Sequence, residues 1–564
     1  MDAQRLVLIL SLAVVTYMLV LAWNDDYGQP VAVRNETITT VSPSLAPGLP
    51  QQQADIPSAS NAPLLDVPGT GATPLTQTAQ LPTNGLILVE TDVLSVQIDP
   101  IGGDIVKVDL KAYPRVITDP GNPFTLLERS NSRIFIAQSG LIGNNGPDAS
   151  ADGRPHYQSA LSSYQMHEGE DALQVNLTLP DSQGISITKT YEFKRGDYLI
   201  NMRYQINNNS TVSWQANLFA QLKRDNSEDP SKSTKMGMAS FVGAATTNPQ
   251  DKYLKLAFDD IAEEPYKQKV AGGWIAILQH YFVSAWIPDP AGEYTYQTRQ
   301  NSQGENIAGL VSAPLNVLPG AAGTFSAQLY TGPKTQSRLG EISPGLELTI
   351  DYGWLWFIAQ PLFWILSTFH SFIGNWGWAI IFTTLVIKLG FFRLSATSYK
   401  SMANMRRVAP ELQSMKERFG GDRQKMSGAM MELYKKEKIN PLGGCLPIVV
   451  QMPVFIALYW VLLESVELRH APFIFWLNDL SIKDPYFILP IIMGASMFFQ
   501  QTLNPEPPDP IQAKVMKMMP IMFTFFFLWF PAGLVLYWVV NNILSIAQQW
   551  TITRQIEKAA AEKS

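Results

Sequence analysis

Cysteine is almost absent from this chain, since Cys445 is its one representative among 564 residues. A single cysteine excludes an intrachain disulfide framework and any metal site that needs several cysteines. Charged residues are also scarce, at 16% of the chain, whereas 46% of the residues are hydrophobic. So little charge argues against a uniformly water-soluble protein. The placement of the hydrophobic residues therefore decides the class.

The hydrophobic residues are concentrated in long uncharged runs near residue 10 and beyond residue 350. A run of about 18 residues or more is typical of a membrane helix. The first run follows Arg5 and is not followed by a small-residue cleavage site. Residues 1–23 are therefore expected to be an uncleaved signal-anchor, with a cleaved signal peptide as the alternative. We predict about six crossings, from the runs at 6–23, 376–392, 445–463, 486–503, 518–530 and 532–550.

The basic residues are distributed unevenly along the chain. Residues 388–440 hold 12 Lys/Arg against 5 Asp/Glu, a local charge of +7 in a chain whose net charge is −6. Basic segments beside membrane helices mark the cytoplasmic side. We therefore assign transmembrane helix 2 to 376–398, a cytoplasmic segment to 399–440, helices 3–6 to 441–550, and a cytoplasmic tail to 551–564. Other basic stretches lack interleaved aromatic residues, so nucleic-acid recognition is not expected.

The segment between the first two crossings has two parts. Residues 24–83 contain nine prolines with many Gln, Thr, Ser and Ala, a composition that predicts a disordered linker. Residues 84–343 show short alternating runs separated by turn residues, which predicts a large antiparallel β-sandwich outside the membrane. The expected strands lie at 94–98, 173–179, 185–191, 198–206, 214–222, 274–286 and 324–331.

A tryptophan-rich segment, 344–375, joins the sandwich region to the second crossing. It contains Trp354, Trp356 and Trp364 and is interrupted by Pro361. Tryptophan is enriched where lipid headgroups meet the hydrocarbon layer. We expect an amphipathic helix in the outer interface, and a membrane-crossing helix is the alternative.

Apolar residues recur at steps of three and four through the cytoplasmic segment, which predicts a helical hairpin around Gly420–Gly421. Methionine is prominent on these faces, at Met402, Met405, Met415, Met426 and Met430. One interpretation is that the methionines only hold the two helices together. The other is that they form an adaptable apolar surface for varied hydrophobic partners.

Residues that carry catalysis are missing from the predicted membrane helices. They contain no carboxylate pair, no Ser/His couple and no nucleotide-binding loop, so an enzyme is not expected. His156, His167 and His280 in the sandwich region lack metal-ligand spacing, so they are interpreted as ordinary surface or core histidines. We accordingly predict no catalytic residue, no metal and no cofactor.

One cation lies among scattered polar residues in the membrane region. Lys388 stands about 18 Å along its helix from the outer end, which would let it reach the inner headgroups as an anchor. Several amides and hydroxyls at a similar depth instead suggest a wet cavity open to the cytoplasm. The predicted helix at 518–530, with ~20 Å of rise, adds a region where the bilayer would be thinned. The candidate polar residues are Thr383, Thr384, Gln451, Gln500, Gln501, Asn541, Asn542 and Ser545.

Residues 350–556 contain the motifs Gly374-Asn-Trp-Gly, Asn440-Pro-Leu-Gly-Gly-Cys-Leu-Pro, Gln451-Met-Pro, Ser465-Val-Glu-Leu-Arg and Phe527-Leu-Trp-Phe-Pro-Ala-Gly-Leu-Val-Leu-Tyr. With these motifs the segment resembles the YidC family of bacterial membrane protein insertases. Gly102-Gly103-Asp104 is similar to the opening of the periplasmic domain of Gram-negative members. The resemblance implies a polytopic α-helical membrane protein with a periplasmic β-supersandwich.

The resemblance also implies a function, partners and site residues. It implies an insertase and chaperone of the inner membrane that acts on nascent integral membrane proteins, alone or with the Sec translocon and its accessory subunits. It implies a hydrophilic groove with one positive charge, which is arginine in many members and Lys388 here, while Arg393 stands where proline is common. Client contacts map onto Thr384 and onto Tyr537 or Trp538. Membrane lipids are expected partners, and the ribosome is a further candidate, although residues 554–564 lack a long basic tail.

Two other functions stay open from the residues alone. A small-solute or anion transporter could use Lys388 as its binding charge, although we find no inverted repeat that would support it. A membrane-anchored envelope scaffold could instead use tryptophans and carboxylates of the sandwich to bind sugar. Deleting most of 84–340 separates the scaffold from an insertase, because only the insertase should remain active.

Overall fold

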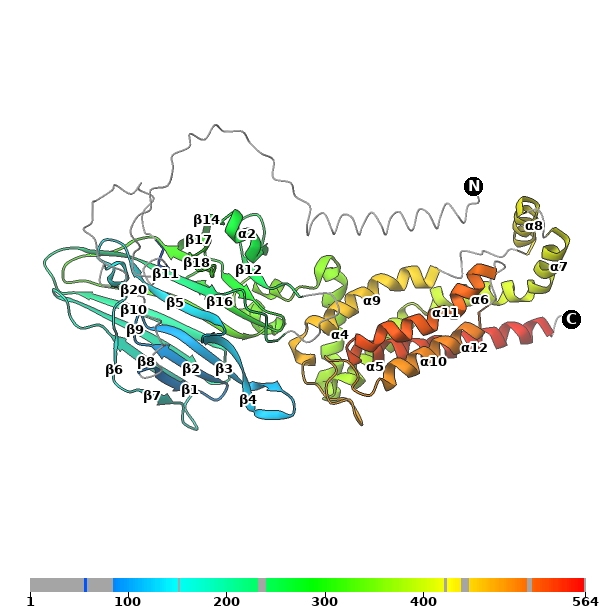
Figure 1. Cartoon of the computed structure of the whole chain (residues 1–564), viewed down its shortest axis with the longest axis horizontal. Helices are drawn as coiled ribbons and strands as arrows, with labels where there is room; N and C mark the ends of the chain where they lie inside the picture. The colour runs from blue at the N-terminus through cyan, green and yellow to red at the C-terminus, as the bar shows by residue number, and fades with distance from the viewer. Residues whose placement is uncertain are drawn as a thin grey trace, which may run out of the picture. The chain divides into compact units, whose positions relative to one another are not determined.

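The computed structural model describes residues 55–57, 85–150, 153–231, 240–419, 423–437, 446–504 and 510–561. Strands fill the blue-to-green part of the chain in Figure 1, and long helices fill the yellow-green-to-red part. The predicted crossing at 6–23 lies outside the described residues, as does most of the linker at 24–83.

Two β-sheets make up the strand-rich part. The larger one has the order β14-β17-β18-β11-β5-β4-β3-β2-β1-β7, with β19 paired to β11. The smaller one has the order β13-β12-β15-β16-β20-β10-β9-β8-β6. The larger sheet consists of β1 (Ile87–Glu90), β2 (Leu94–Asp99), β3 (Asp104–Val116), β4 (Asp119–Arg129), β5 (Ile134–Ile142), β7 (Ser163–Gln165), β11 (Trp214–Arg224), β14 (Lys267–Ala271), β17 (Glu293–Gln300), β18 (Asn306–Ser312) and β19 (Leu315–Val317). The smaller sheet consists of β6 (Gln158–Ser159), β8 (Ala172–Thr178), β9 (Ile185–Lys194), β10 (Leu199–Asn208), β12 (Gly243–Thr246), β13 (Leu254–Leu256), β15 (Ile275–Leu278), β16 (Phe282–Pro288) and β20 (Ala322–Pro333).

The predicted antiparallel sheets are confirmed, with one exception. Neighbouring strands pair antiparallel except β1 and β7, which are parallel. The alternation that predicted β8 also explains its burial, because Val175 and Leu177 are buried while their neighbours are exposed. Gly102 and Gly103 turn the chain between β2 and β3 with φ values of 75° and 64°, which glycine adopts without strain.

Four ionisable side chains lie inside the sandwich beside this glycine turn. The Lys189 ammonium donates to the carbonyl oxygens of Gly103, Gly102 and Ser139 at 2.8, 3.1 and 3.3 Å. The Arg154 guanidinium bonds Asp148 at 2.9 Å and also pairs with Asp104. Each buried charge in the cluster therefore has partners, as burial requires.

Long helices follow the sandwich. They are α4 (Trp356–Ile373), α5 (Trp376–Gly390), α6 (Phe392–Arg407), α7 (Ala409–Phe419), α8 (Arg423–Lys436), α9 (Leu446–Glu464), α10 (Ile488–Thr502), α11 (Pro510–Phe526) and α12 (Ala532–Ala561). Two shorter helices, α2 (Phe258–Glu263) and α3 (Gln336–Ile342), lie earlier in the chain. By length and composition, one helix of the described residues could cross a membrane unaided, Gly353–Ile373. The bent pair α5 and α6 passes the same test together, and the apolar helices Val449–Glu464 and Ile488–Thr502 are shorter.

Several predicted helix boundaries were wrong. Helix 2 does not run continuously to residue 398, because α5 ends at Gly390 and the chain bends by 67° into α6. The helix predicted at 518–530 begins earlier, at Pro510, and ends at Phe526. Its added residues include Lys514 and Lys517, so the uncharged run is no longer than predicted. The tail predicted at 551–564 continues α12 as helix to Ala561.

Helices α7 and α8, with the end of α6 beside them, occupy the segment in which a helical hairpin was predicted. A small core holds them together, formed by Val408, Leu433 and Tyr434 with Met405, Leu412, Met415 and Met430 against it. Met402 and Met426 are half-buried and do not belong to this core. Three of the five methionines thus pack against this small core. This favours, for these three, the interpretation that they only hold the helices together. The glycine turn itself lies outside the described residues.

Candidate functional site

Lys388 lies in the last turn of α5 and is buried, with 7% of its surface exposed. Its ammonium donates a hydrogen bond of 2.7 Å to the Ser545 hydroxyl in α12. That hydroxyl in turn donates to the Asn541 carbonyl oxygen at 2.7 Å. Among the described residues, no carboxylate forms an ion pair with Lys388. The side chain therefore does not extend away from the helices as a free anchor would.

Helices α5 and α12 run parallel, which sets the depth of the other candidate residues. Ile380 lies beside Gly533, with its Cδ1 atom 3.4 Å from where a Gly533 Cβ would stand, and Lys388 lies beside Ser545. Along the contact between the two helices, residue numbers thus increase in the same direction in α5 and in α12. Helix α10 is also parallel to α12, because Asn542 bonds Ser496 at 3.1 Å and, further along both chains, Gln549 bonds Asn504 just after α10 at 3.0 Å.

Thr384 is fully buried, and its hydroxyl donates to the Ile380 carbonyl oxygen at 2.7 Å. The client contact expected of Thr384 is therefore not available from its side chain in this conformation. The Thr383 hydroxyl is also buried and has no partner among the described residues. Of the two threonines, Thr383 is therefore the one whose hydroxyl lacks a hydrogen-bond partner in the described part of the chain.

Three predicted polar residues are half-buried with unused hydrogen-bonding capacity. The side chains of Gln451, Gln500 and Asn541 make no hydrogen bond to other residues in the described part of the chain. Asn542 and Gln549 differ, because their amides hold α10 against α12. The polar residues thus divide into structural amides and amides free to bind something else.

Tyr537 and Trp538 belong to a separate aromatic group. Phe455 of α9 lies 6.1 Å from Tyr537 and 4.4 Å from Trp538, measured between ring centroids. Tyr537 precedes Ser545 by eight residues, or ~12 Å of helix. The structure does not bring this group to Lys388. Tyr537 is buried, and the Trp538 ring N–H has no partner among the described residues.

Two residues near Lys388 escaped sequence analysis. A side-chain hydrogen bond joins Tyr399 of α6 to Ser545, and Ser496 of α10 accepts from Asn542. Ser395 and Ser398 are buried on the same face as Tyr399. This spacing of three and four could have indicated a polar helix face. It was missed because residue 399 was assigned to the hairpin.

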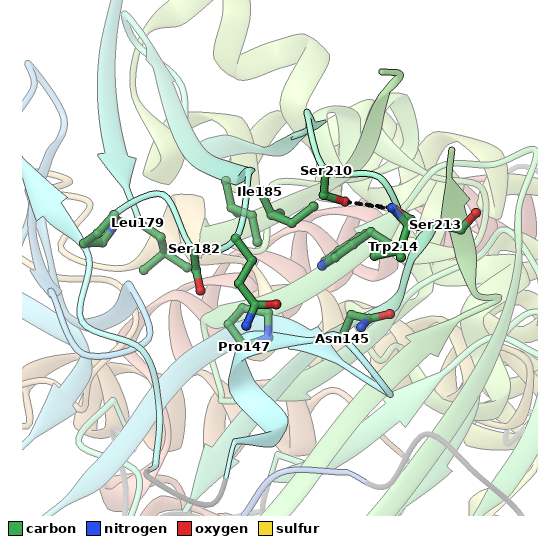
Figure 2. Close-up of a pocket in the computed structure, with 12 residues that line it drawn as sticks. Asn145, Pro147, Leu179, Ser182, Ile185, Ser210, Ser213 and Trp214 are labelled. Atoms are coloured by element: carbon green, nitrogen blue, oxygen red, sulfur yellow. Dashed lines mark hydrogen bonds between the residues drawn. The ribbon is translucent and has the colours of Figure 1, made fainter. Parts of the chain in front are cut away.

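The sandwich contains a second candidate site, a cavity of about 240 Å³. Figure 2 shows Trp214 and Asn145 on one side and Ser182 and Ile185 on another, and the dashed line marks the Val212 amide donating to Ser210 at 3.3 Å. No charged residue lines this cavity. The tryptophan–carboxylate combination expected of a sugar-binding scaffold is therefore absent there.

Comparisons with known proteins cover the whole chain. Residues 86–365 match the YidC periplasmic domain family, and residues 368–559 match the 60Kd inner membrane protein family. A Membrane protein insertase YidC from Pseudomonas putida strain F1 is 58% identical over 561 residues, covering 99% of both chains. The chain belongs to the YidC family. It is accordingly a membrane protein insertase and not an enzyme, as the resemblance implied.

Other YidC relatives extend this similarity. The Membrane protein insertase YidC of Azotobacter vinelandii is 57% identical over 564 residues, covering 99% of this chain and 100% of that one. A crystal structure of an active YidC insertase with its first transmembrane domain resolved covers 83% of this chain and 92% of that chain, at 15% identity and a TM-score of 0.38.

Proposed function

We propose that this insertase receives its clients at Lys388 and at the half-buried amides of Gln451, Gln500 and Asn541. A client helix with a short acidic tail would enter from the cytoplasm, and its carboxylates would bind the Lys388 ammonium. The tail would then be released outward while the apolar helix moves into lipid. Burial of roughly twenty apolar residues would supply the free energy, so no nucleotide is needed.

The partial bonding of Lys388 carries this proposal. An ammonium has three N–H donors, and one of them is used, by Ser545. The other two have no acceptor among the described residues. A buried donor without an acceptor costs about 1–3 kcal/mol, so an incoming carboxylate would gain both charge attraction and two missing hydrogen bonds.

The proposed topology has six crossings, with both termini in the cytoplasm and the sandwich in the periplasm. The parallel contacts of α5, α10 and α12 support it, because the second, fourth and sixth crossings must run in the same direction. The hairpin of α7 and α8 would face arriving chains from the cytoplasm. Met402 and Met426, which lie outside the hairpin core, are then the methionines available to clients.

The sandwich would serve contacts with periplasmic partners and would be largely dispensable for insertion. The Sec translocon with its accessory subunits and the ribosome are proposed partners. Membrane lipids would contact α4, whose Trp356 and Trp364 are 54% and 68% exposed. This exposure is typical of aromatic residues at a membrane interface.

Substitution of Lys388 tests the proposal. Lys388→Arg should insert clients normally, whereas Lys388→Ala and Lys388→Glu should fail with acidic-tailed clients and act better on neutral-tailed ones. The assay measures the fraction of a radiolabelled client whose tail becomes accessible to protease from the periplasm. Equal insertion by the lysine and glutamate forms, at matched protein levels, would overturn the electrostatic role.

A further inference from the structure

Three residues within the proline-rich linker are bound to the sandwich. Asp55, Ile56 and Pro57 are described by the structure, and Asp55 and Pro57 are buried, Asp55 with 8% exposed. We had expected residues 24–83 to form a disordered linker, and this segment departs from that expectation. The bound residues need an explanation in terms of what holds them.

Both the side chain and the main chain of Asp55 are recognised. Its carboxylate accepts from Lys223 Nζ at 2.9 Å and from Asn301 Nδ2 at 2.8 Å. Its carbonyl oxygen accepts from Gln221 Nε2 at 2.8 Å and from the Arg299 guanidinium. Four side chains thus converge on one residue, and we call Gln221, Lys223, Arg299 and Asn301 the Asp55 socket.

The socket is built on the face of the larger sheet that points away from the core. Ala220 and Leu222 of β11 belong to the core, so Gln221 and Lys223 between and after them point to the opposite face. Lys223 of β11 and Arg299 of β17 both lie opposite Ile307 of β18. Regular strand pairing therefore places the two cations on the same face of the sheet, on either side of Ile307, without help from the linker.

Asp55 balances the charge of the socket. Lys223 also pairs with Glu305 at 3.1 Å, and the side chains of Lys223 and Glu305 are 12% and 5% exposed. Without Asp55, Lys223 would keep Glu305 as its partner, whereas Arg299 would lose the carboxylate that acts on it. With Asp55 the two cations face two carboxylates, which is what a partly buried charge cluster requires.

The socket is also fixed from behind. Gln221 Nε2 donates to Gln138 Oε1 at 3.0 Å, and Gln138 Nε2 donates to Asp104 at 3.0 Å. Asp104 belongs to the buried cluster beside the glycine turn. The amide that binds the Asp55 carbonyl is therefore oriented by the sandwich core, so the site is ready before the linker arrives.

We infer that Asp55-Ile56-Pro57 is a docking segment that fastens the linker of the same chain to the sandwich at the Asp55 socket. The ligand that the socket binds is an acidic peptide segment, which the socket contacts at one carboxylate and one main-chain carbonyl. Docking leaves residues 24–54 between the bound segment and the first predicted crossing, and a chain of this length can span at most roughly 110 Å. Because the segment is tethered, its effective concentration at the socket reaches the millimolar range.

Proteolysis of the full-length protein in detergent tests this docking. A protease that cuts before aspartate should cleave the 54–55 bond roughly tenfold more slowly than the 65–66 bond of the same linker, because cleavage requires the docked segment to detach. Lys223→Gln should bring the two rates together. Lys107→Gln is the matched control, since Lys107 pairs with Asp109 at 2.9 Å on the same sheet outside the socket.

Asn301→Asp provides a second variant in case Lys223→Gln does not fold. It keeps the oxygen that accepts from the Gln303 and Glu305 amides, and it places a carboxylate against that of Asp55. It should also abolish the protection. Equal cleavage of both bonds in the unmodified chain would overturn the inference. Protection that disappears on dilution would assign the bound segment to a second copy and overturn docking within one chain.

Discussion

Two buried lysines, Lys189 in the sandwich and Lys388 in the helical region, are bonded in opposite ways. Lys189 is fully buried and donates to three carbonyl oxygens, and it also lies over the rings of Tyr191 and Tyr204. Lys388 is almost as buried and donates to one hydroxyl. A lysine whose donors are all used can only hold a fold together. A lysine with unused donors can bind a ligand.

Of the two lysines, Lys189 should cause the larger loss of stability when it is replaced. Lys189→Met removes three hydrogen bonds to buried carbonyl oxygens. These oxygens keep donors from Tyr191, Tyr204 and Arg154, so we expect a loss of about 2–4 kcal/mol of unfolding free energy. Lys388→Met removes one hydrogen bond and should cost about 1 kcal/mol. Urea unfolding of the full-length variants measures both. Similar losses at the two positions would show that Lys388 is as structural as Lys189.

The Lys189 cluster should also make stability depend on pH. Desolvation lowers the pKa of Lys189 to about 7, although Asp104 opposes the shift. In the unfolded chain the pKa is 10.5, so between pH 7 and 10.5 the unfolded state binds one proton more than the folded state. The unfolding free energy should therefore rise with pH across this window, by up to about 1.4 kcal/mol per unit.

The measurement is the urea midpoint of the sandwich transition at pH 7, 8 and 9. Below pH 7 both states carry the proton, so this contribution should become flat there. A midpoint that falls from pH 7 to pH 9 would show that Lys189 stays protonated in the fold, with its three carbonyl partners outweighing desolvation.

The sandwich could be predicted from the sequence more completely than the site. Alternation in β8 and β10 is a local signal that tertiary structure preserved, because one face of each strand is buried. The parallel pairing of β1 with β7 joins residues far apart in sequence and left no local trace. The bend after Gly390 was likewise invisible, because the hydrophobic run continues to Phe392.

The site was predicted as a set of polar residues at a similar depth in the membrane. In the structure these residues lie on different helix faces, so only some of them meet. Lys388 and Ser545 meet because α5 and α12 are parallel, which follows from topology and not from residue type. Thr384 has the right depth, but its hydroxyl bonds its own helix. The Asp55 socket was missed because a single bound carboxylate does not alter the composition of a proline-rich linker.

A carboxylate placed beside Lys388 would occupy the unused donors of its ammonium, so that Lys388, like Lys189, would have its donors bound within the protein. In Ser545→Asp the new side chain would stand where a hydroxyl now accepts at 2.7 Å, and it would neutralise the ammonium. Insertion of acidic-tailed clients should fall about tenfold, which corresponds to ~1.4 kcal/mol, while neutral-tailed clients change little. Ser545→Asn is the uncharged control of similar size. An equal loss with asparagine would mean that volume, not charge, blocks the site.

The smallest effect is expected when Ser545 is replaced by alanine. Lys388 then loses its one described acceptor but keeps its charge, so it should bind a client carboxylate at least as readily. We expect stability to fall by about 1 kcal/mol, the net value of one hydrogen bond, and insertion to stay within about threefold of the unmodified chain. Unfolding in urea and the protease-accessibility assay measure the two quantities on the same preparation. If Ser545→Ala were as inactive as Lys388→Ala, the hydroxyl would be orienting the ammonium for the client, and charge alone would not explain the site.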